Sequence, residues 1–250
     1  MVTRNKNIMT ESGIVHGYRQ PPEGTQPPYI SSPYRSTRLR GPEQAPIGIA
    51  DLQDELAEVS GPSFEQVRIE QGCADLTLHP QGEPLGERIY VTGRVLDDGG
   101  RPVPNTLVEI WQCNSAGRYL HKNDQHDAPL DPHFRGEGRV LTDAEGRYCF
   151  KTIRPGPYPW RNHFNAWRPA HIHFSVFGCG LANRLVTQMY FPGDPLLDFD
   201  PIYHSIPDSR ARARLVAALD WEQAVSEYAL GYQFNIILRG RFSTPWEQVG

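Results

Sequence analysis

The stretch IYVTGRVLDDGGRPVPNTLVEIW, residues 89–111, contains two segments that are rich in β-branched and aromatic residues. The turn dipeptide Asp98-Gly99 and two prolines separate residues 89–96 from residues 107–111, so the pattern predicts two neighbouring strands. A chain with many short strands and few helices is typical of a β-sandwich, and the sequence therefore predicts a mainly β fold. Further segments of the same kind lie at residues 146–153, 170–177, 185–191 and 232–238.

The first 46 residues differ from the rest of the chain, because they are rich in Pro, Gly, Ser and Arg. Residues 20–33 include five prolines, and proline disfavours both helix interiors and central strands. We therefore expect an extended arm over residues 1–46. The aromatic and apolar residues Tyr29, Ile30 and Tyr34 suggest that part of this arm docks on the protein.

Residues 47–250 are expected to form a single β-sandwich domain with a few short helices. Apolar residues recur at helical spacing in residues 51–59, and residues 208–219 are also predicted to be helical. Residues 114–139 and 154–168 show little periodicity. Loops of that length in a compact domain often carry functional residues.

Composition argues against several kinds of partner. The formal net charge is −4, without the basic excess that nucleic-acid binding needs, and no apolar run approaches the roughly 20 residues of a membrane span. Residues 1–13 lack the apolar stretch of a secretory signal, so we expect a cytoplasmic protein. No CxxC pair is present, and we expect free thiols buried in the core at Cys73, Cys113, Cys149 and Cys179.

The tripeptide His171-Ile172-His173 is the first candidate for chemistry. Residues i and i+2 of a strand point to the same side of the sheet, so the two imidazoles could hold one metal ion. The same pattern also fits two half-buried histidines that bond to the backbone. Further ligands would have to come from loops near the start of this strand.

Carboxylates are scarce around the histidine pair, because no Asp or Glu lies between Glu145 and Asp194. A zinc hydrolase would need a third histidine or a carboxylate, and a ferrous site with two histidines and one carboxylate would need a nearby Asp or Glu. The preceding loop offers Tyr158, whose flanking prolines could present the phenol rigidly. A packed tyrosine bonded to the backbone has the same local pattern, so spacing leaves both possibilities open.

Three longer motifs resemble the intradiol ring-cleavage dioxygenases. They are PGPYPWRNHFNAWRPAHIHF (155–174), NTLVEIWQCNSAGRYLHKND (105–124) and QMYFPGDP (188–195). Within this family they are most similar to the protocatechuate branch, and the similarity runs from about residue 34 to residue 238. The resemblance implies one non-haem Fe(III) ion per chain, bound by the residues that match two tyrosinates and two histidines of the family: Tyr119, Tyr158, His171 and His173.

The resemblance also implies roles for other residues. Phenolate is a hard anionic donor that suits Fe(III), and a bound catechol would be activated for direct attack by dioxygen without NADH or flavin. Arg168 matches an arginine that stabilises negative charge on the ring, Gln188 matches a pocket glutamine, and Tyr158 matches a base for the substrate's protons. Residues that match the lining of the substrate slot are Tyr34, Trp111, Trp160 and Ile202.

Membership of the protocatechuate branch would imply 3,4-dihydroxybenzoate as the substrate and 3-carboxy-cis,cis-muconate as the product, in aromatic catabolism. Arg35, Arg38 and Arg40 follow Tyr34 and could steer the substrate's carboxylate, although a solvated basic arm is the alternative. The branch pairs an iron-bearing β chain with a related α chain that lacks the iron ligands. We therefore expect a hetero-oligomer with an α chain, and a homo-oligomer is the alternative.

Two other functions are compatible with the sequence. The first is an intradiol dioxygenase for another catechol. Catechol and hydroxyquinol enzymes carry a helical N-terminal dimerisation segment, unlike the Pro-rich residues 1–50, whereas 4-sulfocatechol enzymes resemble this branch. The second is a non-catalytic binding module, because residues 93–150 resemble the pattern of transthyretin-like sandwiches. Loss of a tyrosine ligand would have favoured the module, but both tyrosines are present.

Overall fold

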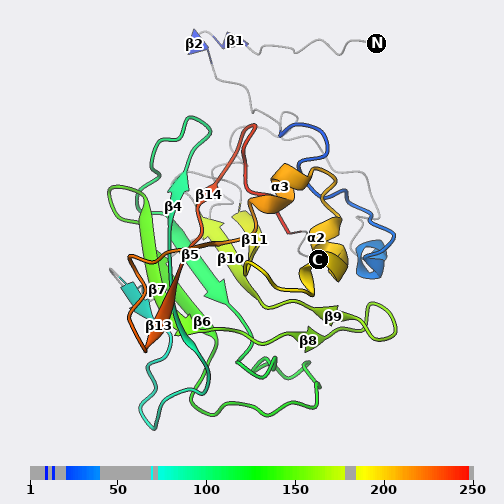
Figure 1. Ribbon diagram of the computed structural model, residues 1–250. Coiled ribbons are helices and arrows are strands. Elements are labelled where there is room, and N and C mark those ends of the chain that lie inside the picture. Colours follow the sequence, from blue (N-terminus) through cyan, green and yellow to red (C-terminus); the bar gives the residue numbers. More distant parts are fainter. Residues whose placement is uncertain are drawn as a thin grey trace.

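Two β-sheets face each other in the computed structural model of the protein (Figure 1). One sheet has four strands in the order β11-β10-β5-β6. The other has six strands in the order β12-β13-β4-β7-β3, with β14 paired to β4. The predicted β-sandwich is therefore confirmed. The structure describes residues 9–10, 13–14, 21–39, 69, 73–177 and 184–247.

The strands are short and the helices are shorter still. The four-stranded sheet contains β5 (Leu107–Trp111), β6 (Glu137–Leu141), β10 (His171–Phe177) and β11 (Arg184–Tyr190). The six-stranded sheet contains β3 (Cys73–Asp75), β4 (Arg88–Leu96), β7 (Arg147–Ile153), β12 (Ala218–Leu219), β13 (Ala229–Gln233) and β14 (Ile236–Ile237). Two further sheets have two strands each, β1 (Met9–Thr10) with β2 (Gly13–Ile14), and β8 (Tyr158–Pro159) with β9 (Trp167–Arg168). The helices are η1 (Arg35–Leu39), η3 (Leu197–Phe199), α2 (Pro201–His204) and α3 (Ser209–Ala213).

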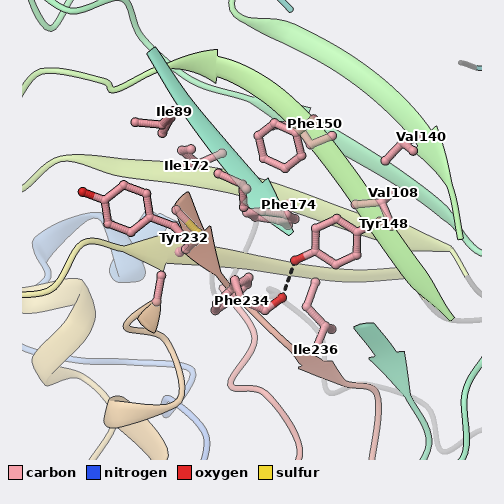
Figure 2. Close-up of a cluster of buried hydrophobic side chains, with 14 of the residues drawn as sticks. Ile89, Val108, Val140, Tyr148, Phe150, Ile172, Phe174, Tyr232, Phe234 and Ile236 are labelled. Carbon is pink, nitrogen blue, oxygen red and sulfur yellow. Dashed lines mark hydrogen bonds between the residues drawn. The ribbon is translucent and has the colours of Figure 1, made fainter. Parts of the chain in front are cut away.

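The hydrophobic core lies between the two sheets (Figure 2). Ile89 on β4 and Phe150 on β7 point inward from one sheet, and Ile172 and Phe174 on β10 point inward from the other. The rings of Phe150 and Phe174 meet across the interface with their centroids 5.9 Å apart. Full burial of each such side chain contributes about 1.5–3 kcal/mol. Side chains alternate between the two faces of a sheet along each strand. Because Ile172 and Phe174 face the core, the residues of β10 that alternate with them face the other side of the sheet.

All six predicted strands are present, but the last one is divided into β13 and β14. The two pieces pair in parallel with successive parts of β4, and the chain between them passes close to Gly93. A Cβ atom at Gly93 would lie 1.9 Å from the carbonyl oxygen of Phe234. Glycine is therefore required where the two backbones come so close.

The prediction of a helix over residues 208–219 is wrong in its length. Only α3 forms, and Asp208 caps its first turn by accepting hydrogen bonds from Arg210 N and Ala211 N. Beyond it, Tyr190 N donates to Leu215 O and Ala217 N donates to Tyr190 O, so the chain pairs with the end of β11. These tertiary hydrogen bonds override a sequence that favours a longer helix.

The cysteine prediction is also wrong in part. β3 pairs in parallel with β7, which places Cys73 directly opposite Cys149, and the two form a disulfide with their Cα atoms 4.5 Å apart. A separation of 76 residues hides this pairing in the sequence. Cys113 is a free, buried thiol as predicted, and Cys179 lies outside the described residues.

Part of the N-terminal arm docks on the sandwich domain. Asn162 Nδ2 donates to Pro33 O, and Arg35 N donates to Asn162 Oδ1, at 2.7 and 2.8 Å. Tyr34 is buried, whereas Tyr29 and Ile30 are exposed and do not anchor the arm on this chain. The predicted helix at residues 51–59 lies outside the described residues.

None of the helices in the described ranges has both the length and the apolar character needed to cross a membrane.

Candidate active site

Two histidines of β10 lie on the face of the strand that points away from the core. His171 and His173 are 1% and 8% exposed, and their ring centroids are 4.8 Å apart. β10 lies between β5 and β11, so His173 is in register with Trp111 on one side and with Gln188 on the other. A central strand therefore fixes both imidazoles side by side, as their i and i+2 spacing requires.

Two tyrosine hydroxyls approach this pair of histidines from loops. Tyr158, on β8, has its hydroxyl oxygen 3.3 Å from His171 Nε2, and Tyr119 has its hydroxyl oxygen 3.2 Å from His173 Nε2. The two phenol rings lie edge to face with their centroids 5.6 Å apart. The structure therefore brings together all four residues that the motifs suggested as metal ligands.

Each histidine uses Nδ1 for a hydrogen bond and turns Nε2 toward a tyrosine. His171 Nδ1 lies 2.7 Å from the carbonyl oxygen of Pro169, which can only accept, so this nitrogen carries the proton. His173 Nδ1 lies 3.0 Å from Glu247 Oε2. Burial, together with the charge of Arg168, lowers the pKa of His171 well below its ordinary value, which keeps the ring neutral. The lone pair of His171 Nε2 is therefore available to a metal ion.

The chemistry of the donors fits a ferric ion. Burial raises the pKa of Tyr119 well above its ordinary value and also raises that of Tyr158, so both phenols need a strong adjacent cation to lose their protons. Two phenolate oxygens and two neutral imidazole nitrogens suit a hard, highly charged ion. Over the part of the chain that the structure describes, no group of three or more His, Cys, Asp or Glu side chains is placed to hold a metal ion.

A buried charge network adjoins the four candidate ligands. The guanidinium of Arg168, which is 3% exposed, donates from Nη2 to Gln188 Oε1 at 2.6 Å, to Asp200 Oδ2 at 2.9 Å and to Tyr190 Oη at 3.1 Å. Burial lowers the pKa of Arg168, but Asp200 and the neighbouring phenols more than offset this effect and hold it well above its ordinary value. Arg168 is therefore a fixed positive charge, and its guanidinium lies 5.6 Å from the ring centroid of Trp160.

The residues expected to line a substrate slot fall into two places. Tyr34, Gln188 and Ile202 line one pocket, and Trp160 packs edge to face against Tyr34 with the ring centroids 5.2 Å apart. Trp111 does not line this pocket. It stacks on His173 with the rings nearly parallel and the centroids 4.8 Å apart, and it also borders a groove beside β6.

Three carboxylates that hold this site together were not singled out from the sequence. Asp200 pairs with Arg168, and its other oxygen caps α2 by accepting from Ile202 N at 3.0 Å. Asp124 accepts from Tyr119 N at 2.8 Å, and Glu247 contacts His173. The Asp-Pro dipeptide at residues 200–201 is a recognisable helix start, whereas nothing near Glu247 in the sequence indicates its position.

Comparison with known proteins places the chain in a family. Residues 59–240 match the family described as Dioxygenase, and residues 18–50 match the one described as Protocatechuate 3,4-dioxygenase beta subunit N terminal. The chain is 56% identical over 226 residues to the protocatechuate 3,4-dioxygenase β chain of Burkholderia cepacia, covering 90% of this chain and 94% of that one. It is 36% identical to a catechol 1,2-dioxygenase of Candida albicans, covering 63% and 57% of the two chains.

Solved structures agree with this placement. The 3-chlorocatechol 1,2-dioxygenase of Rhodococcus opacus matches with a TM-score of 0.53 and 25% identity, covering 71% of this chain and 70% of that one. A catechol 1,2-dioxygenase from Acinetobacter matches with a TM-score of 0.52 and 26% identity, covering 72% and 60%. The chain therefore belongs to the intradiol ring-cleavage dioxygenases, as its three long motifs predicted.

Proposed function

We propose that the chain is the iron-bearing β chain of a protocatechuate 3,4-dioxygenase. It would cleave the ring of 3,4-dihydroxybenzoate between the two hydroxyl-bearing carbons with O2 and yield 3-carboxy-cis,cis-muconate, a step in aromatic catabolism. The observation that carries the proposal is the convergence of two tyrosine hydroxyls on two histidine Nε2 atoms in a chain 56% identical to a protein of that name.

The family uses non-haem iron, and we propose one Fe(III) ion per chain. Its ligands would be the hydroxyl oxygens of Tyr119 and Tyr158 and the Nε2 atoms of His171 and His173. A bound ferric ion supplies Lewis-acid activation of the catechol toward dioxygen. The four side chains are buried or partly buried, so water is largely excluded from the reacting atoms.

Tyr158 is the proposed base for a substrate proton. Burial raises the pKa of its phenol, so its phenolate is a strong base whenever a metal ion no longer holds it. The residue lies on the two-stranded β8–β9 sheet, where Tyr158 pairs with Arg168, while Tyr119 lies in the long loop between β5 and β6. Different elements therefore carry the two tyrosines, so a change in the position of Tyr158 need not move Tyr119.

Arg168 is the proposed stabiliser of negative charge on the activated ring. Its guanidinium is already fixed by Asp200, Gln188 and Tyr190, so no reorganisation is needed when charge develops on the substrate. Gln188 shares this network and also lines the pocket with Tyr34 and Ile202. The proposed catalytic residues and the slot are thus parts of one buried network.

The N-terminal arm is the proposed source of selectivity for an acidic substrate. Tyr34 lines the pocket, and Arg35 and Arg38 follow it in exposed positions on η1. Arg40 lies outside the described residues. Exposed arginines beside the pocket could raise the local concentration of a benzoate anion by steering, an effect that weakens as salt increases.

We also propose a related α chain as the partner. The name of the Burkholderia cepacia relative includes the words beta chain, and residues 18–50 match the N-terminal family of such β subunits. The exposed Tyr29 and Ile30 of the arm do not anchor it on this chain, so they are free to contact a neighbour. Burial of such side chains in an interface would offset the entropy cost of ordering the arm.

The test is product analysis with the purified chain, alone and co-expressed with a related α chain. Protein incubated with 3,4-dihydroxybenzoate and labelled O2 should form 3-carboxy-cis,cis-muconate with both labelled oxygen atoms, and it should be red-brown and contain one iron per chain. Colourless, iron-free protein without turnover would contradict the proposal and favour a binding module. Equal kcat/KM values for catechol would contradict the substrate, and a preference for 4-sulfocatechol would assign the neighbouring activity.

A further inference from the structure

The C-terminal segment, residues 243–247, lies along the outer side of β11. Thr187 Oγ1 donates to Pro245 O at 2.7 Å, and Glu247 N donates to Val186 O at 2.6 Å. Further back, Thr244 N donates to Ile237 O at 2.8 Å. These hydrogen bonds place the side chain of Glu247 beside β10, next to the proposed iron site.

Residues far away in the sequence also bind this segment. Gln26, in the N-terminal arm, accepts from Trp246 N at 2.8 Å and donates to Ser243 Oγ at 3.1 Å. Arg214 Nε donates to Ser243 O at 3.1 Å. A single glutamine of the arm therefore binds the C-terminal segment at two points, 217 and 220 residues away in the chain.

Glu247 reaches the imidazole of His173 from this supported position. Its Oε2 lies 3.0 Å from His173 Nδ1, and the two side chains are 12% and 11% exposed. Trp111 stacks on one face of the same imidazole, and the hydroxyl of Tyr119 lies at Nε2. Together with the carboxylate at Nδ1, these contacts engage both ring nitrogens and one face of the imidazole.

We propose that Glu247 is the positioning residue for His173, and that the N-terminal arm and the C-terminal segment together support one side of the iron site. This inference rests on the proposed iron site. A carboxylate that accepts the Nδ1 proton fixes the tautomer and the orientation of the ring, and it makes Nε2 a stronger donor to a metal ion. His171 needs no such carboxylate, because the carbonyl of Pro169 performs that task within its own strand segment.

Three variants test this role by a readout other than turnover. Iron release to an excess of chelator is followed through the loss of the tyrosinate-to-iron absorbance, in the oligomer as purified. Glu247→Ala should release iron about 10- to 100-fold faster than the wild type, because loss of a group that orients a ligating histidine typically weakens metal binding by that factor. Glu247→Gln retains an oxygen that can accept the Nδ1 proton, so its release rate should lie between those of the wild type and the alanine variant.

Glu109→Ala is the matched control. Glu109 is a partly buried carboxylate on β5, paired with Arg139 at 2.9 Å, and it does not contact His173. Its loss should lower thermal stability without altering iron release. Equal release from wild type and Glu247→Ala would overturn the inference, as would equal changes in Glu247→Ala and Glu109→Ala. Iron-free wild type would instead overturn the proposed function, and with it this inference.

Discussion

Tyr158 and His171 are 13 positions apart in the chain, whereas Tyr119 and His173 are 54 positions apart. The first pair is supported locally, because Tyr158 lies between two prolines and His171 Nδ1 contacts the carbonyl of Pro169, two residues earlier. The second pair depends on two carboxylates, one five residues from Tyr119 and the other 74 residues from His173. Asp124 holds the backbone of Tyr119, and Glu247 holds the ring of His173.

This difference indicates which substitutions should displace the side chains of each pair. Backbone geometry sets the Tyr158–His171 pair, so few single substitutions outside the pair itself should displace it. The Tyr119–His173 pair depends on carboxylates that can be removed one at a time without changing either residue. Removal of either carboxylate should therefore weaken iron retention, whereas a substitution in the Arg168 network beside His171 should lower turnover while iron is retained.

The largest effect is expected from Tyr119→Phe, which removes a proposed oxygen ligand from the Tyr119–His173 pair. Metal ions contribute several kcal/mol to such reactions, and each 1.36 kcal/mol is a factor of ten in rate, so turnover should fall about a thousandfold. Iron content and absorbance should fall together with it. Tyr228→Phe is the control, because Tyr228 is half exposed and bonds to Lys151 far from the site. Full colour and activity in Tyr119→Phe would exclude this residue as a ligand.

Arg168→Ala should have the next largest effect, on the His171 side. Loss of a preorganised charge stabiliser should lower kcat about 10²- to 10³-fold while the iron content stays close to that of the wild type. The substitution also leaves the buried Asp200 without its cation, which should cost about 3–5 kcal/mol of stability. A near-normal kcat with weakened iron binding would contradict the assigned role.

The double variant Arg168→Ala/Asp200→Asn separates these two consequences. Asparagine is uncharged but can still cap α2 through its side-chain oxygen. The free energy of unfolding, measured by denaturant titration, should therefore recover in part, while kcat should stay low. Recovery of kcat with stability would show that the single variant was inactive only because it was unstable.

Local sequence predicted more of the first pair than of the second. The i and i+2 spacing of His171 and His173 sufficed to place both rings on one face of a strand, and the flanking prolines suggested Tyr158 as a rigidly presented phenol, with a packed tyrosine as the alternative. Tyr119 was identified as a candidate ligand only from the resemblance to a family, because its loop has no periodicity. Glu247 could not be predicted, since hydrogen bonds between its segment and distant parts of the chain, including β11 and Gln26, determine its place.

The errors in the fold have the same physical origin. Residues 208–219 have good helix formers, but pairing with Tyr190 at the end of β11 ends α3 after Ala213. β6 was missed because its residues 137–141 include Glu, Gly and Arg, and only Val140 among them is fully buried. The disulfide depends on the pairing of β3 with β7. In each case a contact between distant segments outweighed the local pattern.

Asp124→Ala should have an intermediate effect, confined to the Tyr119 side. The carboxylate accepts from Tyr119 N and His126 N at 2.8 and 2.9 Å, so its loss should let the loop that carries Tyr119 move. Iron affinity, measured by chelator competition, should fall about tenfold, as for other groups that orient a ligand. Asp127→Ala, an exposed aspartate in the same loop, should change nothing. Equal effects of both variants would mean that iron affinity depends on the charge of the loop and not on the hydrogen bond between Asp124 and Tyr119 N.

The smallest effect is expected from Gln26→Ala, which removes two hydrogen bonds between the arm and the C-terminal segment. A hydrogen bond contributes about 0.5–1.5 kcal/mol net, so iron release should become a few-fold faster than in wild type. The exposed Gln81 provides the control variant Gln81→Ala, with no expected change. Because Gln26 binds the segment and not the proposed ligands, we expect its influence to pass through Glu247. Gln26→Ala should therefore have no further effect in a Glu247→Ala background, and additive effects of the two substitutions would show that the arm acts on the site by another route.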